Sequence, residues 1–136
     1  GVNRALEGLA IDVFTQMKEF GDVAGDPFLE FCEDWMLADE VTHVKMGSDW
    51  LRKVTANDPD RRTKALEFQQ VVDKLFSFGG ARGESADSSF SLARRFRELA
   101  GFTDDEVETI SAMDAEALEE RKEAVRRYRE RVGADA

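Results

Sequence analysis

The chain has 136 residues, of which 42% are hydrophobic and 35% are charged, a balance typical of one folded domain rather than a disordered segment. Its formal net charge of −10 argues against a general binder of nucleic acid or of anionic membranes, because both need a basic surface. No apolar run approaches the roughly 20 residues of a membrane-spanning helix. The single cysteine, Cys32, excludes an internal disulfide, which fits a reducing compartment. We therefore expect one cytoplasmic domain over residues 1–136.

Apolar residues recur at helical spacing along nearly the whole chain, and the alternation of β-strands is absent. The spacing predicts a first helix over about residues 3–20, followed by a turn over 21–26. Asp26 and Pro27 are typical of an N-cap and a first-turn proline, so a second helix should run from there to about Val54. We expect these two helices to form a long antiparallel hairpin.

Shorter helices should follow this hairpin and complete an all-α antiparallel bundle. A second cap-and-proline signal begins the third of them, and Gly101 is a good helix-ending residue. The expected elements are a third helix from residue 59, with Ala65, Phe68, Val72, Leu75 and Phe76 on one side, a flexible loop over 77–89, a fourth helix over 90–100, a short fifth helix with Thr103 and Glu106 as capping box, and a final charged helix from Asp114 to Gly133.

The second helix carries a carboxylate and the only histidine of the chain on one face. Glu40 and His43 lie one turn apart, at the centre of a stripe that should be buried. The other members of the stripe are Leu29, Cys32, Met36, Gly47 and Trp50. Burying a carboxylate without a partner is costly. A bound cation would satisfy the pair, since a carboxylate and a neutral imidazole at this spacing can bind the same metal ion.

The first helix offers a third ligand, Glu7. Glu7 and Glu40 are equally far from the centre of the turn predicted over 21–26, so an antiparallel hairpin should bring both carboxylates to the same height. One glutamate from one helix and Glu-x-x-His from its neighbour are half of the six-ligand set of carboxylate-bridged di-metal bundles. Asp39 is expected to accept the N–H of a ligating histidine on a facing helix.

A purely structural interpretation of the same residues competes with the metal site. In it, Glu40 forms a salt bridge with Arg94 or Arg95, and His43 is hydrogen-bonded in the core. No metal is then needed to explain the burial of the pair.

Five segments occur in order along the chain: EGLAIDVFTQM, AGD, DEVTHVKMGSDWL, NDP and AGFTDDE. Together they resemble the C-terminal half of an uncharacterised ferritin-like family, which is related in fold to the di-iron tRNA hydroxylases and other ferritin-like oxidases. The resemblance covers about residues 7–106 and implies a ferritin-like bundle in which Glu7, Glu40 and His43 are metal ligands. The chain has Leu9 where the family pattern has an arginine.

The family's complete bundle has two further helices, with another Glu and another Glu-x-x-His. This chain has one histidine, so it supplies only half of that set. The remaining ligands should come from a second copy in a homodimer, from a companion chain, or from a missing N-terminal half, which the early start of the first helix favours. In the dimer, doubling the three ligands would give four glutamates and two histidines.

The resemblance implies a non-haem di-iron oxidase or oxygenase that binds two iron ions in each completed site, with manganese or a mixed manganese–iron pair as alternatives. A ferroxidase or iron-handling protein without an organic substrate is a second interpretation. A third is a non-catalytic helical interaction module, whose charged helix over 114–132 docks elsewhere.

Overall fold

The structure of the protein is a computed structural model, which describes residues 2–78 and 92–133. Nearly all of these residues are helical, and no strand occurs among them, so the described chain is all-α as the sequence predicts. The helices in chain order are α1 (Val2–Ala24), α2 (Pro27–Val54), α3 (Pro59–Phe78), α4 (Arg94–Leu99) and α5 (Asp104–Gly133). The loop expected over 77–89 lies outside the described residues from position 79 onward, and positions 77 and 78 belong to α3.

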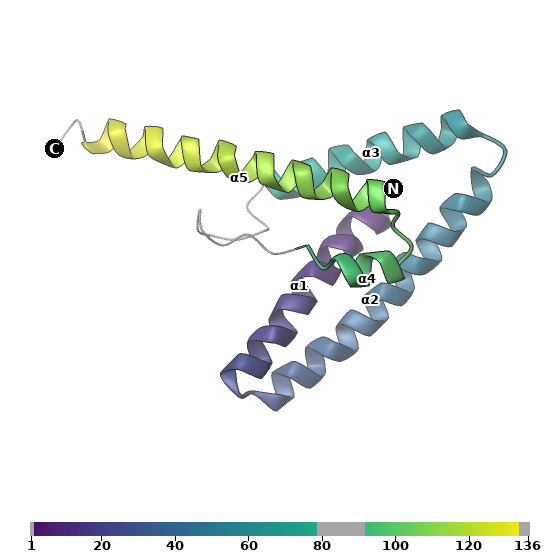
Figure 1. The fold of residues 1–136 in the computed structure, drawn as a ribbon, viewed down its shortest axis with the longest axis horizontal. Coiled ribbons are helices and arrows are strands. Elements are labelled where there is room, and N and C mark those ends of the chain that lie inside the picture. Colours follow the sequence, from purple (N-terminus) through teal and green to yellow (C-terminus); the bar gives the residue numbers. More distant parts are fainter. Residues whose placement is uncertain (1, 79–91, 134–136) are drawn as a thin grey trace.

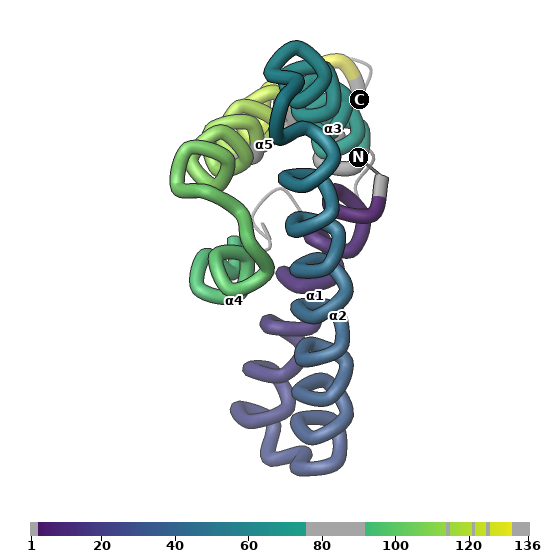
Figure 2. The backbone as a smooth tube through the Cα atoms, turned by 90° about the vertical axis from the view of Figure 1, so that its right-hand side faces the viewer, coloured from purple at the N-terminus to yellow at the C-terminus, as the bar shows by residue number. Residues whose placement is uncertain are grey.

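Helices α1 and α2 form the expected antiparallel hairpin, and they lie side by side in both Figure 1 and Figure 2. Helix α3 folds back across the open end of the hairpin, α4 covers one side of it, and α5 runs away from it toward its C-terminal end (Figure 1). Within residues 2–78 and 92–133, no helix is both long enough and apolar enough to cross a membrane.

The hairpin turn is shorter than the sequence suggests. Helix α1 does not end near residue 20 but continues to Ala24, and Gly25 then takes a positive φ of 68°. A Cβ on Gly21 would lie 2.7 Å from the backbone nitrogen of Glu30, so this glycine permits close helix approach and does not form a turn. The beginning of α2 is as predicted, because Asp26 accepts hydrogen bonds from two backbone N–H groups of its first turn.

The core uses a face of α2 that differs from the predicted one. The buried residues of this helix are Glu33, Leu37, Val44 and Ser48. Met36 and Trp50, which were expected to be buried, are 40% and 62% exposed. Helix α2 has apolar residues on two sides, and spacing alone does not indicate which side its own chain covers.

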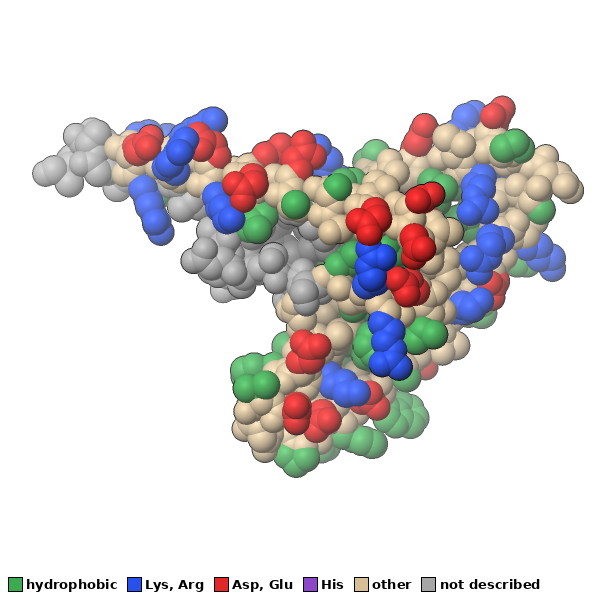
Figure 3. Space-filling model, in the orientation of Figure 1, with side chains coloured by type: hydrophobic (Ala, Val, Ile, Leu, Met, Phe, Trp, Pro, Cys, Tyr) green, Lys and Arg blue, Asp and Glu red, His purple; other side chains and the backbone are tan. Residues whose placement is uncertain are grey.

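The uncovered apolar side of α2 is here called the outer face. Its large side chains are 39–76% exposed. They are Phe28, Phe31, Trp35, Met36, Met46, Trp50 and Val54. Hydrophobic side chains gather at the surface around the closed end of the hairpin, where α1 ends and α2 begins (Figure 3). Apolar surface of this extent is typical of an interaction site.

Buried arginines tie the C-terminal helices to the hairpin. Arg97 forms a two-pronged salt bridge with Asp12, in which both side chains are fully buried and the shortest contact is 2.6 Å. Arg4 donates hydrogen bonds to Ser48, Gln69 and Glu106, at 3.0, 3.0 and 2.8 Å. Neither of these buried arginine contacts was predicted from the sequence.

The remaining helices depart from the prediction in detail. On α3, Phe68 and Leu75 are 50% and 65% exposed, while the polar residues Gln69 and Asp73 are buried. Helix α4 begins only at Arg94, whereas a start at residue 90 was expected. The capping box at the start of α5 is confirmed, because the backbone N–H of Thr103 donates to Glu106 at 2.8 Å and that of Glu106 donates back to Thr103. No new helix begins at residue 114, since α5 is continuous to Gly133.

Candidate metal centre

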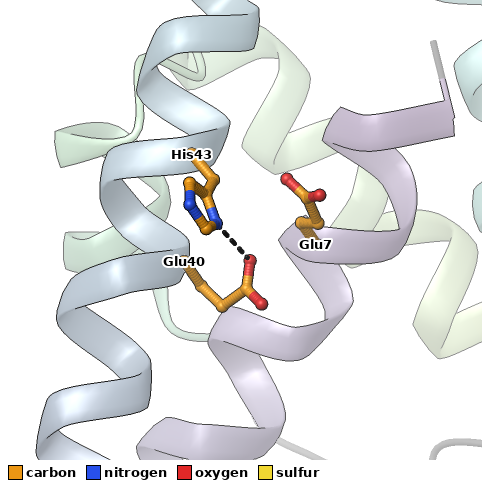
Figure 4. A group of neighbouring side chains, drawn as sticks. All are labelled: Glu7, Glu40 and His43. Atoms are coloured by element: carbon orange, nitrogen blue, oxygen red, sulfur yellow. Dashed lines mark ion pairs between the residues drawn. The ribbon is translucent and has the colours of Figure 1, made fainter.

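Glu7, Glu40 and His43 come together between α1 and α2 (Figure 4). Each offers one ligand atom, and these atoms all lie within 4.8 Å of one another. Glu40 and His43 extend from successive turns of α2, while Glu7 extends from α1 toward them. The sequence thus identified three side chains that the fold brings together.

The reason for their proximity differs from the predicted one. Because α1 ends at Ala24, the contacts between the helices match Arg4 with Ser48 and Gly21 with Glu30. In this register Glu7 is level with His43, and Glu40 lies about one turn closer to the hairpin turn. The predicted equal height of the two carboxylates is therefore wrong, and the reach of the side chains closes the gap.

Glu40 lies in an environment that does not satisfy its charge. Its Oε2 atom is buried and has no hydrogen-bond partner among the described residues. The imidazole of His43 lies beside it, with Nδ1 3.8 Å from Oε2, too far for a hydrogen bond. Burial raises the pKa of Glu40, the neighbouring carboxylates of Glu7 and Asp39 raise it further, and His43 offsets only part of this effect.

These three residues fit a divalent metal ion. Two ligand atoms each about 2.1 Å from one ion are at most about 4.2 Å apart. The 3.8 Å between Glu40 and His43 is within this limit, and small side-chain rotations would bring in the Glu7 carboxylate. Two carboxylates and an imidazole suit iron, manganese or zinc. A cation here would also give the Glu40 oxygen the partner that it lacks.

Asn3 of α1 and Gly47 of α2 lie against each other beside the centre. The side-chain amide of Asn3 donates a hydrogen bond to Oε2 of Glu7, which holds this carboxylate on the α2 side of its helix. A Cβ on Gly47 would overlap the side chain of Asn3, so the glycine allows α1 to approach α2 here. The sequence interpretation placed Gly47 in the stripe around Glu40 and His43 but missed Asn3. Its position four residues before Glu7, on the same helix face, is the signal that could have found it.

The competing salt bridge to an arginine is not formed. Arg94 pairs with Glu108 and Glu98, and the Arg95 guanidinium lies 5.8 Å from the ring centre of Phe96. Glu40 therefore has no arginine partner in the described part of the chain.

Asp39 lies on the outer face of α2 and is exposed. Among residues 2–78 and 92–133 no hydrogen bond to its carboxylate is formed, and no histidine is present on a facing helix. The role expected for Asp39, accepting the N–H of a ligating histidine, would need a group from outside this chain.

A shallow cavity of about 420 Å³ adjoins the centre on its exposed side. His43 forms one edge of the cavity, and Asn3 and Arg4 of α1 form another. The remaining lining comes from α2, mostly from the outer face: Met46, Gly47, Trp50, Leu51 and Val54. The candidate centre is thus open toward an apolar surface, and His43 is 48% exposed there.

Comparisons with known proteins do not assign a function to this site. No family model, no curated protein and no solved structure matches the chain. The resemblance to a ferritin-like family stays a prediction from the sequence segments.

Proposed function

We propose that the protein binds iron through Glu7, Glu40 and His43 and acts as a non-haem di-iron oxidase or oxygenase on an organic substrate. The main support is the buried Glu40 oxygen without a hydrogen-bond partner, beside a second carboxylate and an imidazole. Such an arrangement is unfavourable for a protein that uses these residues only for packing, because it gathers negative charge that His43 and Asn3 offset only in part. It is favourable for a protein that binds a cation there.

Each residue has a distinct part in this function. Glu7 and Glu40 would neutralise the charge of the ion, and Asn3 keeps Glu7 oriented through its hydrogen bond. His43 would bind through Nδ1, the nitrogen that faces Glu40. Bound iron supplies one-electron redox chemistry with oxygen, which no side chain of the centre supplies by itself.

The ferroxidase alternative also has some support. His43 is half exposed and the chain carries a net charge of −10, so a ferrous ion would reach the centre easily. Oxygen uptake separates the two functions. A ferroxidase consumes oxygen in proportion to the ferrous iron added and needs no organic reductant or substrate.

An anaerobic titration with ferrous iron, repeated with Co²⁺ to obtain visible absorption bands, tests the metal site itself. Wild-type protein should bind about one ion per chain, and His43→Ala and Glu7→Gln should lose most of this binding while keeping their helical circular dichroism. Glu19→Gln is the matched control, because Glu19 is an exposed glutamate on the same helix as Glu7. Absence of binding by the wild type would reject both iron functions and leave the helical interaction module.

A further inference from the structure

The outer face of α2 is the largest feature of the molecule that the proposed function leaves unexplained. It runs from Phe28 to Val54, about 39 Å along the helix. Its large apolar side chains project into solvent on the side to which the candidate metal centre is open. A partner bound to this surface should therefore both cover the apolar side chains and supply the missing metal ligands.

We propose that this occupant is a second copy of the chain, packed with its α2 antiparallel to the first across a two-fold axis near position 41. The completion of the metal centre depends on the proposed function, whereas the packing does not. An axis at position 41 pairs residues that are equally distant from it. Phe28 then faces Val54 of the second copy, and Met36 faces Met46.

The same register fits large residues against small ones. Trp35 of one copy lies opposite Gly47 of the other, where the cavity of about 420 Å³ has room for an indole ring. Trp35 is 69% exposed in the single chain, so its burial there would remove much apolar surface from water. Trp50 likewise faces Cys32, another large residue against a smaller one.

Two polar residues of this face also match each other. Asp39 of one copy lies opposite His43 of the other in the same register. Because Nδ1 of His43 faces Glu40, Nε2 is directed to the opposite side of the ring and would donate to this Asp39. One pairing therefore gives Asp39 its acceptor role and covers the exposed edge of His43.

The position of the axis explains why one chain holds only three ligands. Glu40 lies at the middle of α2, so an axis there brings both copies of the ligand cluster to the centre of the interface. Four glutamates and two histidines then share one site, and an isologous contact of this kind closes at two subunits. A different partner would need its own matching ligands, whereas the second copy carries them already.

Native mass spectrometry and sedimentation, with and without Co²⁺, test the oligomeric state. The proposal expects a dimer, and it expects Trp35→Glu to raise the dissociation constant about tenfold or more. Tyr128→Glu, which changes an aromatic residue of α5 that is 58% exposed, should leave the dimer intact. A monomeric wild type, or a dimer that Trp35→Glu does not weaken, would overturn the proposal.

A cross-link tests the register separately from any loss of stability. Cys32 is the only cysteine, and in the proposed dimer its two copies are about 27 Å apart along the helix, so mild oxidation should not link them. Trp50→Cys places a second thiol opposite Cys32 and should give a covalent dimer quickly. Tyr128→Cys is the control, and equal rates for the two variants would refute this packing.

The results for metal and for packing are independent of each other. A dimer that cross-links as expected but binds no metal would support the packing and reject the iron site. A monomer that binds iron through His43 would do the reverse.

Discussion

Replacing Glu40 by glutamine tests whether this residue serves the fold or a ligand. The substitution keeps the shape of the side chain and removes its charge. If Glu40 stabilises the fold, the variant should be less stable. If Glu40 is held in place for a cation, the metal-free variant should be more stable, because the wild type keeps a buried carboxylate oxygen without a partner beside Glu7.

The expected size follows from the environment of the carboxylate. A buried polar atom without a hydrogen bond costs about 1–3 kcal/mol. The Glu40 side chain is 23% exposed and the new amide also has hydrogen-bonding needs, so we expect a gain of about 1 kcal/mol, at the lower end of this range. Metal should reverse the order. At a free concentration one hundred times its dissociation constant, a bound ion adds about 2.7 kcal/mol to the wild type, and the variant should lose most of this increment.

Urea unfolding followed by circular dichroism, at one protein concentration with chelator and then with Co²⁺, measures both effects. Glu106→Gln is a control of opposite sign, since this glutamate accepts a hydrogen bond from the buried Arg4 at 2.8 Å. Its loss should destabilise the protein by about 1.5–3 kcal/mol with or without metal. A metal-free Glu40→Gln variant that is less stable than the wild type would refute the reasoning.

Two further predictions concern the ionic contacts around the hairpin. Asp12→Asn should lower the free energy of unfolding by about 3–5 kcal/mol, because it leaves Arg97 as a buried charge without its counter-ion. The control Asp34→Asn, at an exposed ion pair between α1 and α2, should lower it by less than about 1 kcal/mol. Similar losses for the two variants in urea unfolding would contradict this reasoning. The pKa of Glu106 is lowered below 4.5, since the hydrogen bonds that it receives, mainly from Arg4, outweigh the opposing effect of burial. The stabilisation from the Glu106 carboxylate should thus be present above pH 4.5 and should be lost as the pH falls through the folded-state pKa. The difference in unfolding free energy between wild type and Glu106→Gln should therefore shrink in acid. A difference that stays constant with pH would show that the interaction is not ionic.

Local capping signals in the sequence predicted the starts of α2 and α5 correctly, but not the start of α4. Asp26 with Pro27, and Thr103 with Glu106, are capping patterns whose hydrogen bonds involve residues only a few positions apart. Such interactions do not depend on the rest of the fold. The all-α class follows from the same kind of local information.

Features that depend on contacts between residues far apart in the sequence could not be predicted in this way. Gly21 is a turn former by type, but the close approach of Glu30 gives it a packing role inside α1. The salt bridge between Asp12 and Arg97 joins residues that no spacing rule relates. The candidate ligands were found nevertheless, because Glu40 and His43 share one helix and the long side chains tolerate an error of about one turn in the register of Glu7.

Helix α2 has two apolar faces, and the candidate ligands lie on the border between them. The inner face, with Leu37 and Val44, builds the core of the single chain, while the outer face remains exposed. A carboxylate on this border is buried enough to lose its water and is still open enough, beside His43, to receive an ion. Within one chain neither the charge of Glu40 nor the apolar outer face is satisfied. A bound cation would account for the first and a second copy for the second, and since both meet at the middle of α2, one assembly would satisfy them together.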